Sequence, residues 1–276
     1  MDDKIGAVTA SRIVFGLVVN TPGSDLPARV DRLTEMVGAH AGLEVARFDA
    51  SSYEALATEV REGRVDVAWL PPIVFVRLAD AVTPLGSIVR AGKTAYEAAL
   101  VVRSDSRIKA IEGLRGSRAG WVDPWSAAGF VLPRVKLALL GVDPRTVFRT
   151  ETFHGSHRAA MKALAEGACD VAGTYAQADE SGNVTAGAWS EIEGASVRVL
   201  ATFGAIPPDV IAVRATLPEE TKQKVLEALR AACTQEPTRK ILREIFNGDE
   251  LSEGLASGYE SLKSALEMAT RRGLFD

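Results

Sequence analysis

The chain has few features of a secreted disulfide protein, a membrane protein or a nucleic-acid-binding protein. Its 276 residues include only two cysteines, Cys169 and Cys233, which have no C-x-x-C spacing, so we expect two free thiols. The longest early apolar run, Ile13 to Val19, is far shorter than the roughly 20 residues of a membrane-spanning helix, which argues against membrane insertion. With a net charge of −4 and scattered lysines and arginines, the chain has no basic patch for nucleic acid.

The first residues also lack the basic start, apolar core and small-residue cleavage site of an export signal. On the sequence as given we therefore expect a cytoplasmic protein, or a periplasmic one if a signal peptide has been removed.

Motifs for catalysis and for cofactors are missing as well. There is no G-x-S-x-G, no Walker loop and no G-x-G-x-x-G after a strand. His154 and His157 have H-x-x-H spacing but no third ligand at a useful distance. We expect no metal, no cofactor and no catalytic residue.

What the sequence does contain is an alternation of strands and helices. It predicts strands at 13–19, 43–48 and 65–70, helices at 26–41, 53–62 and 73–80, and a strand at 98–103 that leaves the first unit. The end is helical, at 219–234, 237–246 and 259–272. This pattern is typical of a mainly parallel sheet flanked by helices, and the last three helices are expected to pack on the first unit.

One stretch has the form of a binding loop. The apolar strand 119–122 runs into Asp123-Pro124, and Ser126-Ala127-Ala128-Gly129 then opens a helix. The first N–H groups of a helix have no backbone partner and carry partial positive charge, so small residues there make a seat for an anion. The alternative is that Ser126 or Asp123 is an ordinary helix cap without a ligand.

A second stretch makes the pattern more specific. D-P-W-S-A-A-G-F at 123–130 and F-H-G-S-H-R-A-A at 153–160 together resemble the substrate-binding proteins of phosphate, phosphonate and phosphite ABC importers, the PhnD type. The segments V-D-V-A-W-L at 65–70 and I-P-P-D at 206–209 are similar to that family too. The resemblance covers roughly residues 13 to 265.

The resemblance implies an α/β, two-lobed type 2 periplasmic-binding-protein fold, with a ligand cleft between the lobes and a hinge. Residues 1–102 and 205–276 would form lobe 1, and residues 103–204 lobe 2. Asp209 would then be a counter-charge for a ligand ammonium, or a solvated loop residue. The implied ligand-binding residues are Ser126, Ala127, Ala128, Trp125, His157, Ser156, Tyr96, Trp69 and Asp209.

The chain departs from the family in its anion loop, where S-A-A-G replaces S-T-S-G. Two hydroxyl donors are gone, so we expect weak phosphonate binding and a preference for a carboxylate with an apolar body against Trp125.

Three functions fit the sequence. The first is a solute-binding protein that closes on a small anionic molecule and delivers it to an ABC permease. The second is an enzyme on the same fold acting on a small carboxylate, with His157 and Asp123 as acid and base. The third is a ligand-sensing partner of a signalling protein.

Overall fold

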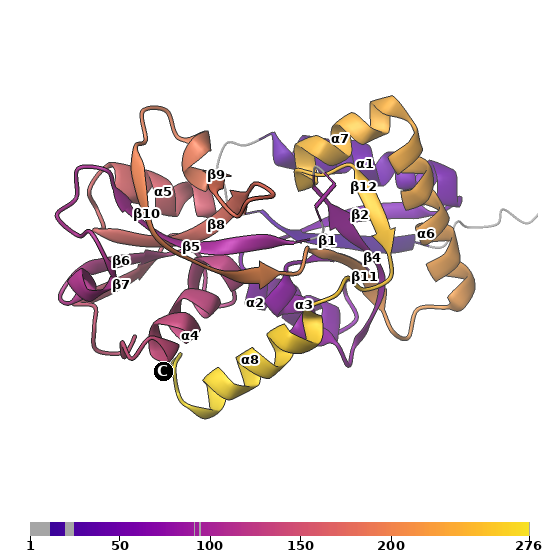
Figure 1. The fold of residues 1–276 in the computed structure, drawn as a ribbon. Helices are drawn as coiled ribbons and strands as arrows, with labels where there is room; N and C mark the ends of the chain where they lie inside the picture. The colour runs from indigo at the N-terminus through magenta and orange to yellow at the C-terminus, as the bar shows by residue number, and fades with distance from the viewer. Residues whose placement is uncertain (1–11, 20–24, 91, 94, 276) are drawn as a thin grey trace, which may run out of the picture.

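The computed structural model describes residues 12–19, 25–90, 92–93 and 95–275, and folds them into two lobes, each built on one sheet (Figure 1). The predicted loop 20–25 lies outside the described residues except for Asp25, and so does the N-terminus in which no export signal is predicted.

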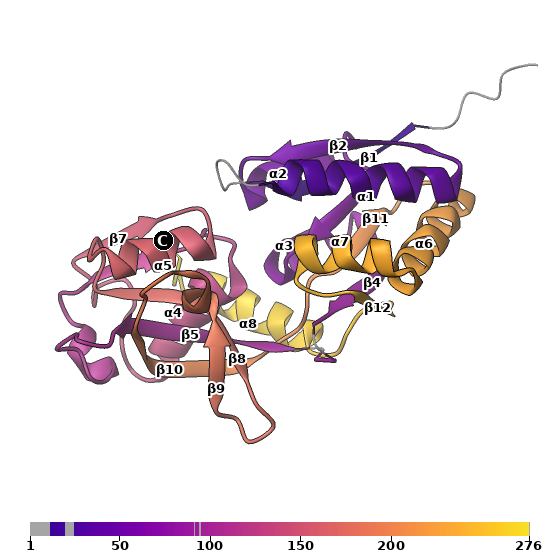
Figure 2. The ribbon, with the colours of Figure 1, turned by 90° about the horizontal axis from the view of Figure 1, so that it is seen from above.

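The sheet of lobe 1 has the strand order β12-β4-β11-β3-β1-β2. Its strands are β1 (Arg12–Val18), β2 (Glu44–Ala50), β3 (Val67–Leu70), β4 (Val82–Val89), β11 (Val210–Arg214) and β12 (Glu250–Glu253). Its helices are α1 (Leu26–Ala41), α2 (Tyr53–Arg61), α3 (Pro72–Leu78), α6 (Glu219–Thr234) and α7 (Glu236–Phe246). Side chains alternate along a strand, so Ile13, Phe15 and Leu17 of β1 point to one face of the sheet and share a core with α1, α6 and α7. Helices α2 and α3 cover the other face, below the sheet in Figure 1. Figure 2 shows the molecule from above, the side of α1 and α7.

The sheet of lobe 2 has the strand order β10-β5-β8-β6-β7, with β9 paired to β8. Its strands are β5 (Tyr96–Arg103), β6 (Arg118–Trp121), β7 (Thr150–Phe153), β8 (Val171–Ala178), β9 (Val184–Gly187) and β10 (Val197–Ile206). Its helices are α4 (Leu132–Leu139), α5 (His157–Ala165) and three short turns at Ile111–Leu114, Ala127–Val131 and Ala188–Glu191.

The two-lobed α/β fold expected from the sequence is confirmed, and each sheet is mixed. β1 pairs in parallel with β2 and β3, and β6 with β7 and β8. The first strand after each lobe connection pairs antiparallel with both of its neighbours, β5 with β8 and β10, and β11 with β3 and β4. The reason is that chain arriving from the other lobe enters the sheet from the opposite end.

The strand pairing bears on where the chain crosses between the lobes. β5 pairs with both β8 and β10, so residues 96–102 belong to the second sheet, and β10 extends to Ile206. We therefore propose that the chain crosses between the lobes at 90–95 and at 207–209, a few residues from the boundaries that the sequence suggested.

The last helix, α8 (Tyr259–Arg271), corrects the prediction that the C-terminal helices all pack on lobe 1. Tyr259 begins in the lobe 1 core, with its ring against Phe75, but Leu262, Leu266 and Ala269 pack into the core of lobe 2. Figure 1 shows the C-terminus beside α4. The apolar stripe of α8 is helical in period, and period alone does not say which core receives it.

Candidate functional site

A pocket of about 530 Å³ lies between the lobes. Residues at the carboxyl ends of the parallel strands line it. Val18 ends β1, Tyr53 follows β2 and Trp69 lies on β3, while the segments after β6 and β7 supply Ser126 and Ser156. In open α/β sheets this edge is where ligands bind, because the loops there can vary without disturbing the sheet.

Lobe 2 presents the start of a helix at Ser126. The Ser126 hydroxyl accepts a hydrogen bond of 3.0 Å from the Gly129 N–H, which caps a π-helical turn, Ala127–Val131, that continues into α4. Gly129 is required because a Cβ there would lie 2.3 Å from Val122 Cγ2. The tight packing brings Ser126 and Ala127 to the pocket. The early N–H groups of this turn lack helical partners, so they are available to an anion.

A second helix start lies beside it. The Ser156 hydroxyl accepts from the Ala159 N–H at 3.1 Å and caps α5, whose first residue is His157. Burial lowers the pKa of His157 to about 4, so the ring is neutral at neutral pH. Its Nδ1 lies 3.0 Å from Thr174 Oγ1, and Thr174 is fully buried. When the Thr174 hydroxyl donates to Nδ1, His157 Nε2 carries the proton and donates into the pocket.

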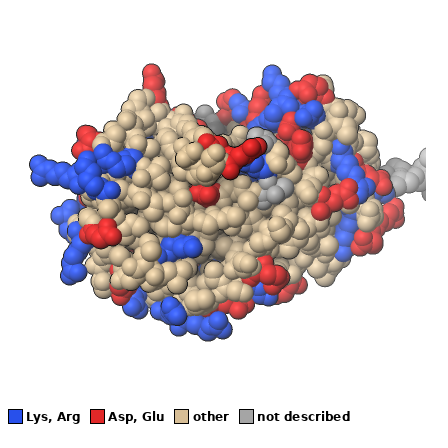
Figure 3. All heavy atoms as spheres, in the orientation of Figure 1, with Lys and Arg blue, Asp and Glu red and all other residues tan. Residues whose placement is uncertain are grey.

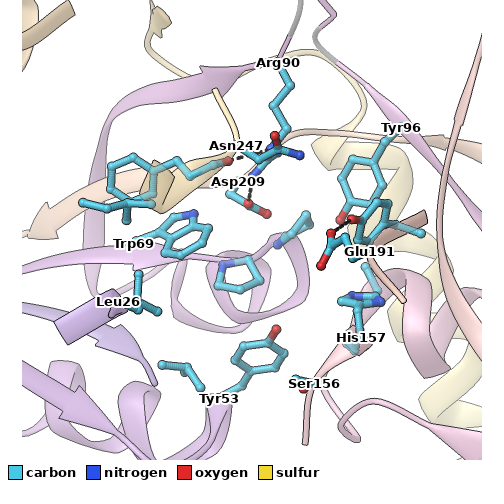
Figure 4. A pocket seen from close by; sticks show the side chains of 18 of the residues that line it. Leu26, Tyr53, Trp69, Arg90, Tyr96, Ser156, His157, Glu191, Asp209 and Asn247 are labelled. Atoms are coloured by element: carbon cyan, nitrogen blue, oxygen red, sulfur yellow. Dashed lines mark hydrogen bonds and ion pairs between the residues drawn. The ribbon is translucent and has the colours of Figure 1, made fainter. Parts of the chain in front are cut away.

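Hydrogen-bond donors from lobe 1, and from Tyr96 at the start of β5 in lobe 2, face these helix starts. The indole Nε1 of Trp69 is buried without a partner among the described residues, and its ring meets Phe246 edge-on at 4.8 Å. Burial raises the pKa of Tyr53, and Asp209 and Asp123 raise it further, so the Tyr53 phenol stays protonated. The Tyr96 hydroxyl is kept protonated in the same way, first by burial and then by Asp209. Figure 4 shows Tyr53, Trp69, Tyr96 and His157 around one space.

An ion pair closes one end of the pocket. Arg90 Nη2 donates to Asp209 Oδ2, and Arg90 Nε donates to the carbonyl of Phe246 at 2.9 Å (Figure 4). Burial by itself lowers the pKa of Arg90, but the Asp209 carboxylate more than offsets this and the pKa is raised. Asp209 is therefore not the free counter-charge that the sequence suggested, since an arginine of the chain already neutralises it.

Seven of the nine predicted site residues line the pocket: Ser126, Ala127, Ser156, His157, Tyr96, Trp69 and Asp209. Two do not. Ala128 is 1% exposed and packs inside the core of lobe 2, because successive residues of a helical turn point in different directions.

Trp125 lies outside the pocket as well. Its ring is covered by the guanidinium of Arg77 from α3, with Arg77 Cζ 4.2 Å from the ring centroid, and it packs against the cores of both lobes. The Trp125 ring thus makes a cation–π contact with a residue of the chain. Trp125 acts as a contact between the lobes.

Residues 15–259 match the family model described as "ABC transporter, phosphonate, periplasmic substrate-binding protein". The chain belongs to this phosphonate-binding family. It is also 28% identical over 185 residues to the phosphate-import protein PhnD of Mycolicibacterium smegmatis, a match that covers 61% of this chain and 58% of that protein. The matched region spans about three fifths of the length of the curated relatives.

Two solved structures share the fold. The binding component of an ABC phosphonate transporter from Pseudomonas aeruginosa has a TM-score of 0.82 at 20% identity, covering 96% of this chain and 88% of that one. PhnD1 from Prochlorococcus marinus, in complex with methylphosphonate, has a TM-score of 0.77 at 15% identity, covering 95% and 99%.

Sequence reasoning missed several pocket residues of this phosphonate-family protein. Tyr53 had a usable signal, because it follows a strand and directly follows Ser52, which caps α2 by accepting from the Ala55 N–H. Arg90 had no such signal, because it follows β4 and no strand is predicted from the sequence at that position. The other missed polar residues are Tyr175, Gln177, Glu191, Arg243, Glu244 and Asn247.

Other predictions concern the rest of the described chain. Cys169 and Cys233 are free thiols, as expected, and burial raises the pKa of Cys169 to about 11. In the described ranges no group of three His, Cys, Asp or Glu could hold a metal ion. No helix in the part of the chain that the structure describes is long and apolar enough to cross a membrane. On the face drawn in Figure 3, acidic residues lie among the lysines and arginines at both ends of the molecule, so neither end is purely basic.

Proposed function

We propose that this family member binds a small tetrahedral oxyanion of the phosphate or phosphonate type between its lobes. The observation that carries the proposal is the convergence of two capped helix starts, at Ser126–Ala127 and Ser156–His157, on a pocket whose opposite wall holds Tyr53 and Trp69. Helix N-termini favour negative charge, and protonated phenol and indole groups donate hydrogen bonds.

The donors of Trp69, Tyr53 and Tyr96 answer the argument for weak phosphonate binding. The S-A-A-G loop has lost two hydroxyls, but Trp69 Nε1 has no partner within the described part of the chain, and Tyr53 and Tyr96 are protonated at the pocket. Each hydrogen bond to a charged acceptor contributes about 1.5–3 kcal/mol, so two such donors offset the loss. The carboxylate preference rested on an apolar wall at Trp125, which lies against Arg77 instead. A carboxylate ligand with an apolar body is therefore not favoured.

The proposed role is delivery of the bound oxyanion to an ABC permease, with the periplasmic location that the family description names. The printed ligands of relatives, phosphate import in one and methylphosphonate in another, agree with this ligand class. The rival enzyme required His157 and Asp123 to act together. Asp123 does not line the pocket and accepts backbone N–H groups from Trp125 and Tyr53. The comparisons also give no support to a signalling partner.

Calorimetric titration with methylphosphonate and inorganic phosphate tests the proposal. We expect micromolar or tighter binding of at least one compound, and a loss of about 1.5–3 kcal/mol in Tyr53→Phe, which removes one donor. Tyr259→Phe is the matched control, because its hydroxyl donates to the Pro208 carbonyl outside the pocket. Absence of binding at millimolar concentrations of both compounds would overturn the proposal.

A further inference from the structure

At one end of the pocket, the carboxylate that could receive a cation is already paired with an arginine of the chain. Asp209 is only 8% exposed and lines the pocket. A buried carboxylate without a partner attracts a cation strongly, because leaving the charge unpaired is costly. Here that partner is the guanidinium of Arg90, which also lines the pocket.

Arg90 is held in place from several directions. Its Nε–H donates to the Phe246 carbonyl at the C-terminal end of α7, where the helix dipole is negative. Its backbone N–H and carbonyl both pair with Lys93 in the first connection between the lobes. Asp209 lies in the second connection, where its carbonyl accepts from the Ile88 N–H. The ion pair therefore joins both connections beside the pocket, and a ligand cation would have to displace a well-anchored arginine.

We propose that Arg90 is an internal counter-ion for Asp209, and that it makes this pocket select oxyanions with an uncharged substituent over oxyanions that carry an ammonium group. The inference rests on the proposed oxyanion-binding function and specifies the class of ligand. The position next to Asp209 that would suit an ammonium is filled by a positive charge, so a ligand ammonium meets repulsion where it would otherwise find a partner.

The other charges of the pocket do not provide an equivalent site. Arg243 pairs with Glu236 and Asp249. Glu244 pairs with Arg29, with 3.5 Å between Glu244 Oε2 and Arg29 Nε. Glu191 lines the pocket and accepts a hydrogen bond of 2.6 Å from the Tyr175 hydroxyl, but it is exposed to solvent. Because water and salt screen an exposed carboxylate, Glu191 attracts an ammonium much less than a buried Asp209 without a partner would.

The test compares two ligands of the same shape, n-propylphosphonate and 2-aminoethylphosphonate, in which an ammonium replaces the terminal methyl group. We expect the unmodified protein to bind n-propylphosphonate at least about tenfold more tightly, since like charges at close range are strongly unfavourable. Arg90→Met should shift the ratio of the two dissociation constants by at least about tenfold toward the ammonium compound. The double variant Arg90→Met/Asp209→Asn should lose that shift.

Arg214→Met is the matched control, because Arg214 forms a comparable ion pair with Asp66 in lobe 1 that does not line the pocket. It should leave the ratio unchanged. If Arg90→Met does not fold by circular dichroism, Asp209→Asn provides an opposite test: it leaves the Arg90 charge uncompensated and should disfavour the ammonium compound further.

The outcomes separate the two proposals. Equal or tighter binding of 2-aminoethylphosphonate by the unmodified protein overturns the inference, and so does an unchanged ratio in the folded Arg90 or Asp209 variant, while the oxyanion-binding function stands. If n-propylphosphonate, methylphosphonate and phosphate all fail to bind, the proposed function fails and the inference falls with it.

Discussion

Ala127 and Ala128 are neighbours in the sequence but occupy different surroundings. Ala127 lines the pocket, whereas Ala128 packs inside lobe 2. We predict that Ala127→Ser strengthens methylphosphonate binding by up to about tenfold through one added donor, measured by calorimetry. Ala128→Ser should leave the affinity unchanged and lower the melting temperature, because it buries a hydroxyl. The opposite pattern would show that the side chain at 128 reaches the ligand.

His157 combines a role in binding with a measurable effect of pH. Burial lowers its pKa from 6.5 to about 4, so between these values the unfolded chain binds a proton that the folded protein does not. The free energy of unfolding should therefore fall as the pH drops from 6.5 to 4, and this contribution should be constant above and below that window. Urea titrations at several pH values should show a shallower slope in His157→Ala, which should also weaken oxyanion binding by about 1.5–3 kcal/mol at pH 7. An identical pH slope in the variant would contradict a buried neutral ring.

At the scale of elements, the segment 123–125 of lobe 2 bridges to two helices of lobe 1. Burial raises the pKa of Asp123, and this is partly offset by hydrogen bonds from the N–H groups of Trp125 and of Tyr53, the first residue of α2. Trp125 lies against Arg77 of α3. These contacts form only when the lobes are close together, so they stabilise the closed state.

We predict that Arg77→Met weakens methylphosphonate binding by about 0.5–2 kcal/mol, the range of a cation–π contact, and speeds dissociation although Arg77 does not line the pocket. Stopped-flow and calorimetric measurements would show this. Arg64→Met is a suitable control, since Arg64 pairs with Glu59 and Glu62 within lobe 1. Unchanged dissociation in Arg77→Met would mean that the bridge does not contribute to closure.

At the scale of the molecule, two short connections and the bridging helix α8 join the lobes and permit a hinge motion. We predict that saturating methylphosphonate lowers the radius of gyration in X-ray scattering and raises the melting temperature, because the ligand binds the closed folded state. It should also change the tryptophan emission. Trp69→Phe and Trp125→Phe should each reduce that change, since Trp69 lines the pocket and Trp125 meets Arg77 when the lobes close. A radius of gyration that is the same with and without ligand would contradict the hinge.

The sequence by itself determined the local features of this protein. The serine caps at Ser126 and Ser156 are short-range features, formed by a hydroxyl and an N–H group three residues later, and the sequence named Ser126 as a possible cap. The alternation of strands and helices likewise placed both segments at the carboxyl ends of strands, and with them the lobe 2 wall of the pocket.

The tertiary structure alone decided which distant residues meet. Arg90 and Asp209 are 119 residues apart and pair because both connections between the lobes pass the same end of the pocket. Trp125 contacts Arg77 because the lobes approach each other there, and α8 packs on both lobes although its pattern fits either one. Local propensity and periodicity act over one or a few helical turns, whereas charge pairing and core packing depend on the path of the whole chain. For that reason the two helix starts at the pocket could be predicted from the sequence, while the Arg90–Asp209 ion pair could not.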